Sequence, residues 1–221
     1  MGRLKTQIAL LSCVFALLFP AVSRAAEPAE KGPVIDSVLG AVEWAPLVTS
    51  LASKGALYST FTEQRWFGFK KTPVELRGEL RYSPEQGLCL NYTGEDAKMV
   101  ILDSQGVLLR DAKGRQKVAP NDAKVSDLIR SVLTIMEMDL EQLRQTYQLH
   151  GVRKNADWRL DFEPRSKELA KTLGTITVFG AQEDVKHLVF RRGSTARVEI
   201  FITATRQVAA FNADERKRYF R

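Results

Sequence analysis

Few side chains in this sequence have the type and spacing that catalysis or metal binding requires. The two histidines, His150 and His187, are far apart, and no metal-binding spacing such as H-x-x-x-H is present. G-x-S-x-G, a phosphate-binding glycine loop and a dinucleotide fingerprint are absent as well. We therefore expect no metal site, no catalytic triad and no cofactor.

Three acidic residues, Glu137, Asp139 and Glu141, lie close together in the sequence. Paired carboxylates can act as general acid and base. The apolar spacing around these three places them at a junction between helices, where acids commonly face water or cap a helix. We therefore expect a protein that is not an enzyme. A secreted hydrolase that uses one of these acids or His150 is an alternative.

The first 25 residues have the pattern of a secretory signal peptide. Arg3 and Lys5 precede an apolar run over residues 8–22, and small residues occupy the cleavage positions before Ala26. We expect export and cleavage near Ala25. Cys13 raises the alternative of a lipidation site, but the apolar run continues past it, so we interpret it as an ordinary cysteine of the signal.

Cleavage would leave Cys89 as the only cysteine, so the fold must be stable without an intramolecular disulfide. We expect a buried, inert thiol. The signal carries three basic residues, so its removal would lower the formal net charge of the chain from +7 by three. The remaining basic residues form a solvated surface that can also suit an anionic membrane or an acidic partner, and we expect no nucleic acid.

Alternation of side chains predicts an antiparallel meander over residues 61–118. Its second strand places Val74, Leu76, Leu80 and Tyr82 on one face and charged residues on the other. Trp66, Phe67 and Phe69 beside two lysines could suggest base stacking, but core packing is the commoner role of such residues. Four further strands are expected at residues 158–162, 174–179, 186–191 and 197–205.

Helical spacing separates the two groups of strands. Residues 120–149 predict two helices that divide at Asp139, the second over 140–149. Two short helices are expected within 34–53, a helical turn at 166–172 and a charged surface tail at 212–221. Because no strand–helix–strand alternation occurs, we expect a mainly β fold with helices. The helical insert would cover the apolar face of a curled antiparallel sheet.

Several motifs, in order, resemble the periplasmic outer-membrane lipoprotein carrier (LolA-type) family. The motifs are an F-x-x-Q strand at 61–64, a G-x-L strand at 78–80, a strand ending in an aromatic residue at 87–92, a hairpin at 99–106, a strand ending in proline at 158–164, and a late strand at 198–203. The resemblance spans residues 44–220. It divides the chain into a signal peptide (1–25), an N-terminal lead (26–43) and a carrier domain (44–221).

The resemblance implies a curved, incompletely closed antiparallel β-barrel that is lidded by α-helices. It implies a monomeric carrier in the periplasm whose apolar cavity shields the acyl chains of a lipoprotein between inner and outer membrane. Its partners would be an inner-membrane release complex and an outer-membrane receptor. The family has an Arg-Pro pair after the G-x-L strand, where this chain has Ser83-Pro84. Another acylated cargo, such as a glycolipid, is therefore an alternative.

Apolar residues of the meander and the helical insert are the candidates for the cavity and its lid. Methionine adapts its shape to varied apolar partners, which suits such a cavity, although plain core packing is the commoner role. The candidates are Trp66, Leu76, Leu80, Tyr82, Leu90, Tyr92, Met99, Ile101, Leu128, Ile129, Val132, Leu133 and Met136. A binding module of the same fold that senses lipidated or misfolded proteins is the alternative function.

Overall fold

The computed structural model describes residues 31–35, 38–120, 122–193 and 196–221. The expected signal peptide, its cleavage site and Cys13 lie outside the described residues. The strands are β1 (Ala56–Trp66), β2 (Val74–Ser83), β3 (Gly87–Tyr92), β4 (Lys98–Asp103), β5 (Gly106–Asp111), β6 (Gln116–Val118), β7 (Tyr147–Lys154), β8 (Asp157–Pro164), β9 (Thr175–Ala181), β10 (Asp184–Arg192) and β11 (Ala196–Val208). The α-helices are α2 (Val38–Ala52), α3 (Ala123–Glu137), α4 (Leu140–Thr146), α5 (Lys167–Leu173) and α6 (Ala213–Tyr219).

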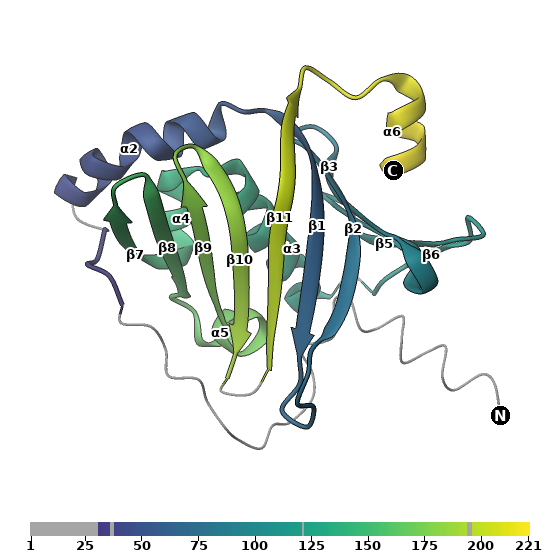
Figure 1. The fold of residues 1–221 in the computed structure, drawn as a ribbon, viewed down its shortest axis with the longest axis horizontal. Helices are drawn as coiled ribbons and strands as arrows, with labels where there is room; N and C mark the ends of the chain where they lie inside the picture. Colours follow the sequence, from purple (N-terminus) through teal and green to yellow (C-terminus); the bar gives the residue numbers. More distant parts are fainter. Residues whose placement is uncertain (1–30, 36–37, 121, 194–195) are drawn as a thin grey trace.

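One antiparallel sheet contains all eleven of these strands. Its order is β6-β5-β4-β3-β2-β1-β11-β10-β9-β8-β7, so the first and last of the described strands pair at the centre. The sheet curves strongly between β2 and β5, and α3 and α4 lie behind it in the view of Figure 1. The pairing runs from β6 to β7 without closing a ring. This confirms the expected open, curved antiparallel barrel with helices.

Two core clusters fill the concave side of the sheet. One joins α2, α3 and α4 to the inward side chains of β7, β8 and β9, and includes Trp44, Leu143 and Phe162. The other joins α3 to β1 through β5 and includes Phe61 and Tyr92. Val132 of α3 packs against both clusters, so this helix bridges the two halves of the sheet.

The helices between the two meanders divide where expected, but the second is shorter than expected. Met138 ends α3 in the left-handed conformation (φ 52°), and the Asp139 carboxylate caps α4 by accepting from the backbone N–H of Glu141 at 3.0 Å. The expected helix over 140–149 is wrong after Thr146, because Tyr147 begins β7. Tyr147 is fully buried and packs edge-on against Phe162 of β8.

The N-terminal part also differs from the expectation of two short helices. One helix, α2, runs through Pro46, and before it residues 33–35 pair with the edge strand β7. The Ile35 N–H donates to the Leu149 carbonyl at 2.9 Å, and the Gly151 N–H donates to the Pro33 carbonyl at 3.0 Å. These bonds cover part of an otherwise unpaired sheet edge.

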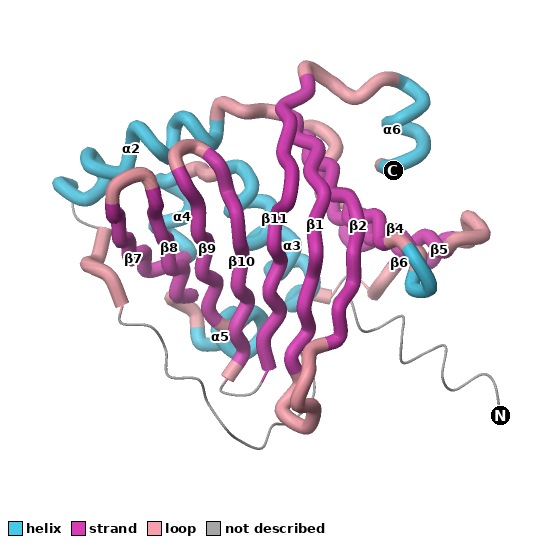
Figure 2. Tube along the Cα trace, in the orientation of Figure 1, coloured by secondary structure: helices cyan, strands magenta, loops and turns pink. Residues whose placement is uncertain are grey.

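The C-terminal tail is not the plain charged surface that the sequence suggests. Asn212 and Glu215 form a reciprocal capping box that starts α6. Phe211 and Phe220, on either side of the helix, are buried on the convex face of β3–β5, where Figures 1 and 2 place α6 apart from the other helices. Cys89 lies beneath them, wholly buried, and burial raises the pKa of its thiol to about 12. The expectation that this thiol is buried is therefore confirmed.

Candidate binding cavity

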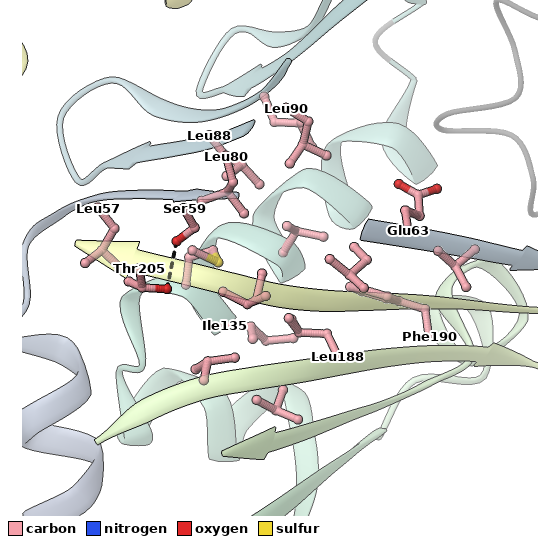
Figure 3. Close-up of a pocket in the computed structure, with 18 of the residues that line it drawn as sticks. Leu57, Ser59, Glu63, Leu80, Leu88, Leu90, Ile135, Leu188, Phe190 and Thr205 are labelled. Carbon is pink, nitrogen blue, oxygen red and sulfur yellow. Dashed lines mark hydrogen bonds between the residues drawn. The ribbon is translucent and has the colours of Figure 1, made fainter. Parts of the chain in front are cut away.

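An apolar cavity of about 230 Å³ lies between the helices and the concave face of the sheet (Figure 3). Its apolar lining comes from α2 and α3, from the end of α5, and from seven strands. The apolar lining residues are Leu51, Leu57, Leu80, Leu88, Leu90, Tyr92, Val100, Leu102, Leu128, Val132, Ile135, Met136, Met138, Leu173, Val178, Val185, Leu188, Phe190, Val198, Ile200 and Ile202. Such a surface suits hydrocarbon and offers little to a polar ligand.

Strand alternation explains why these side chains meet. Leu88 and Leu90 of β3 face the cavity, whereas Cys89 between them faces the opposite side. A bulge in the pairing of β1 with β11 changes which residues of β11 point inward. Ile200 and Ile202 line the cavity before it and Thr205 after it. The Thr205 hydroxyl lies 3.0 Å from that of Ser59, the contact dashed in Figure 3.

A buried charged cluster occupies one end of the cavity. Arg65 and Glu63, both on β1, form an ion pair, and the Tyr92 hydroxyl donates to Glu63 Oε2 at 2.6 Å. Glu63 is 3% exposed and Arg65 5%, so the pair is almost completely removed from water. Tyr92 in turn packs edge-on against Phe61 at 5.5 Å between ring centroids. The cluster is the polar feature against which a ligand at this end would rest.

A second, more exposed polar group closes the other end. Lys54, just after α2, forms an ion pair with Asp184 at 3.0 Å and donates to the Glu183 carbonyl. Hydrogen bonds from Lys54 and Lys186 hold the pKa of the Asp184 carboxyl below its usual value. This contact ties the end of α2 to the turn between β9 and β10, so it bridges helix and sheet at the cavity.

The structure brings six of the thirteen candidate residues together in this cavity. They are Leu80, Leu90, Tyr92, Leu128, Val132 and Met136. Leu76, Tyr82 and Ile129 belong instead to the core cluster beside the cavity, and Leu133 packs against that cluster. Trp66 lies on the convex face, where the Arg197 guanidinium stacks on its ring at 4.5 Å. Ser83, in place of the family's arginine, is not among the lining residues.

The expected cavity lining is wrong by one position on β4, at Met99 and Ile101. Both face away from the cavity toward α6, while their neighbours Val100 and Leu102 line it. A strand has a side-chain period of two, so choosing the wrong parity selects the wrong face. The third of the apolar lining that β9–β11 supply was missed as well, although Ile200 and Ile202 alternate with polar and outward-facing residues in the sequence.

The residues considered for chemistry do not come together. His150 Nδ1 lies 3.0 Å from the Gly32 carbonyl, and His187 is stacked between Phe179 and Phe201; neither lines the cavity. Within the described part of the chain, no group of three metal-ligating side chains gathers. None of the helices described is both long and apolar enough to span a bilayer.

Comparison with known proteins identifies the family. No curated protein matches the sequence. A DUF1329 family protein from Desulfovibrio piger is 11% identical with a TM-score of 0.44, covering 79% of this chain and 95% of that chain. A putative outer membrane lipoprotein-sorting protein domain from Vibrio parahaemolyticus is 10% identical with a TM-score of 0.42 (80% and 96%). The structure of the Pseudomonas aeruginosa MucA/MucB complex is 12% identical with a TM-score of 0.44, and the match covers 79% of this chain and 59% of that chain.

The family model described as "Outer membrane lipoprotein carrier protein LolA-like" matches residues 38–218. That range begins with α2 and ends inside α6, so it contains every strand and helix that surrounds the cavity. Since the match covers most of the 221 residues, this chain belongs to the outer membrane lipoprotein carrier protein LolA-like family.

Proposed function

We propose that this protein is a non-enzymatic periplasmic carrier that encloses the acyl chains of a lipidated molecule between α3 and the sheet. The observation that carries the proposal is the cavity, whose lining is apolar apart from a polar group at each end and the Ser59–Thr205 contact. Export rests on the signal-like first 25 residues. The cargo would be a lipoprotein or a glycolipid, carried by a monomer from an inner-membrane release complex to an outer-membrane receptor.

The energetic need for such a cavity is large. Moving a sixteen-carbon chain into water costs roughly 13 kcal/mol, at about 0.8 kcal/mol for each methylene group. Unassisted transfer across an aqueous compartment is therefore very slow. A cavity that replaces water with Leu, Ile and Val side chains removes most of this cost without covalent chemistry.

The volume indicates that the structure represents a closed state. At about 230 Å³ the cavity exceeds the roughly 150 Å³ that holds a benzene molecule. It is smaller than the roughly 300–1,000 Å³ of typical small-molecule sites. Part of one acyl chain fits, and a complete lipid anchor requires α3 to move outward. Because Asp122 and Met138 satisfy the helix ends locally, α3 can move as a unit.

Displacement of a fluorescent fatty acid from the purified mature chain tests the proposal. The variant Ile200→Trp fills the cavity from β11, and Val132→Phe fills it from α3; each should weaken probe binding at least tenfold. Val152→Trp, a matched change at an exposed position on β7, should bind like wild type. Melting temperatures identify any variant that is misfolded. Probe binding that none of the folded variants alters would refute the cavity as the lipid site.

The alternative is a sensor of lipidated or misfolded proteins on the same fold, which the small volume of the closed cavity favours. A sensor would bind acyl probes and associate with a membrane partner only when loaded. A carrier would also move labelled lipid from donor to acceptor vesicles. Transfer measured with both vesicle populations present therefore separates the two functions, since loading without transfer supports the sensor.

A further inference from the structure

The turn between β1 and β2 carries two phenyl rings, of which Phe69 is exposed and Phe67 is half-buried. Phe67 and Phe69 stack with their ring centroids 5.6 Å apart, and Phe69 is 80% exposed. Phe69 is the most exposed large apolar side chain among the described residues. The expectation that these aromatic residues pack in the core is therefore wrong for Phe69. A single exposed apolar residue is ordinary, but two stacked rings at a turn form a small apolar surface.

Backbone hydrogen bonding holds this surface in place. The Lys70 N–H donates to the Phe67 carbonyl at 2.9 Å, which closes a four-residue turn around Gly68 and Phe69. The turn continues two long paired strands, since β1 and β2 pair from Leu57 to Arg65. The rings are therefore carried on a rigid extension of the sheet, which projects at its lower edge in Figure 1.

The surroundings of the rings are basic. Lys70 and Lys71 follow directly, both are exposed, and residues 67–73 contain no acidic residue. The end of β10, with Arg191 and Arg192, lies at the same end of the molecule (Figure 1). Within the described residues, no acidic side chain pairs with any of these four cations. The end therefore has an excess of positive charge beside the exposed ring of Phe69.

We infer that this tip, residues 67–71, docks on a bilayer that contains anionic phospholipid. Aromatic side chains partition into the interface between headgroups and acyl chains, and adjacent lysines are attracted to the negative surface. A protein partner with an acidic groove would use the lysines but would not need an exposed phenyl ring stacked on a second one at a turn. The combination of apolar tip and uncompensated positive charge fits a membrane better.

Docking would bring the cavity close to the bilayer. Arg65, which lines the cavity with Glu63, precedes Phe67 by only two residues on the same strand. Figure 3 shows Glu63 and Phe190 together at one end of the cavity, away from Leu57 and Thr205. The membrane would therefore meet the end that holds the buried charged cluster. The inference itself concerns the tip and does not depend on what the cavity binds.

Vesicle flotation with the purified mature chain tests the inference. Wild type should bind phosphatidylcholine vesicles that contain phosphatidylglycerol, and binding should weaken as salt is raised. The double variant Phe67→Ser/Phe69→Ser should bind at least tenfold more weakly. Lys70→Gln/Lys71→Gln should lose roughly 25-fold on anionic vesicles, since each lysine near such a surface contributes about fivefold. It should lose almost nothing on phosphatidylcholine alone.

Val118→Ser, at an exposed apolar position on β6, is the matched control and should bind like wild type. Trp66 adjoins the tip, whereas the other two tryptophans are buried in the core, so brominated lipid should quench Trp66 fluorescence in the docked state. Fatty-acid probe binding in solution should be the same in the tip variants and wild type. Absence of wild-type binding to anionic vesicles, or unchanged binding by Phe67→Ser/Phe69→Ser, would overturn the inference even if the cavity binds lipid.

Discussion

The hydroxyl of Tyr92 on β3 donates a hydrogen bond of 2.6 Å to the carboxylate of Glu63 on β1, at one end of a mainly apolar cavity. The same carboxylate pairs with Arg65 two residues along the strand. Removing two charges from water is expensive, and a good ion pair with a further hydrogen bond offsets much of that cost. The arrangement is therefore sensitive to loss of any one member.

The first prediction concerns this pair. Glu63→Leu removes the carboxylate that neutralises a buried guanidinium, and we expect a loss of about 3–5 kcal/mol in the free energy of unfolding. Tyr92→Phe removes a hydrogen bond to a charged group and should cost about 1.5–3 kcal/mol. The double variant Glu63→Leu/Arg65→Leu should recover most of the loss. Urea denaturation of the three variants measures these values. A double variant as unstable as Glu63→Leu would contradict this account.

The expected fold was correct where a strand has one buried and one solvated face. On β2 the alternation of Leu76, Leu80 and Tyr82 with charged residues identified the inward face, and the structure places all three in the concave core. On β4 the run from Met99 to Leu102 is apolar throughout, because α3 covers one face and α6 the other. A strand buried on both faces shows no alternation, so its sequence could not distinguish lining from backing residues.

Two other elements were missed for related reasons. The tail places Phe211, Tyr219 and Phe220 around a seven-residue helix, too short for a repeating apolar stripe, among four basic residues. The bulge between β1 and β11 moves Thr205 into the cavity, and a change of strand register of this kind has no signal in a single sequence. The polar ends of the cavity join residues far apart in the chain, such as Lys54 and Asp184.

A second prediction concerns the Lys54–Asp184 contact. Asp184→Asn should speed dissociation of a bound acyl probe, because the tie between α2 and the sheet is weakened. Stability should change by less than about 1 kcal/mol, since the pair is partly exposed. Stopped-flow displacement and thermal melts measure both effects. Glu75→Gln breaks the exposed Glu75–Arg77 pair away from the cavity and should leave the dissociation rate unchanged.

The pH dependence of that contact follows from the same carboxyl. The pKa of Asp184 is lowered in the folded state, so its contribution is present above the ordinary value of about 3.9 and is lost as pH falls through the lowered value. Probe release from wild type should therefore resemble that from Asp184→Asn only in strong acid. A difference between the two that disappears already near pH 6 would assign the contact to another group.

A third prediction concerns the last residue of α3. Burial and the nearby Asp139 raise the pKa of Glu137. The folded state then binds more protons than the unfolded state between the two pKa values, so ionised Glu137 opposes folding above both. Glu137→Gln should raise the melting temperature at pH 7, and the gain should shrink as pH falls through the raised pKa. Glu141→Gln, in the first turn of α4, is the control and should show no such gain.

The last prediction uses Cys89 to report on the C-terminal helix. Phe220 is 1% exposed and covers the convex face above the thiol, which is itself fully buried. Phe220→Ala should cost about 3–5 kcal/mol in the packing of this cluster, because a large buried ring is removed. If α6 then separates from the sheet while the rest remains folded, Cys89 becomes reactive toward Ellman's reagent well below the melting temperature. Leu173→Ala, equally buried in the concave core, should lower stability without exposing the thiol at that temperature. Equal reactivity in both variants would mean that Cys89 is reached only through global unfolding, and that α6 is an integral part of the cooperative core.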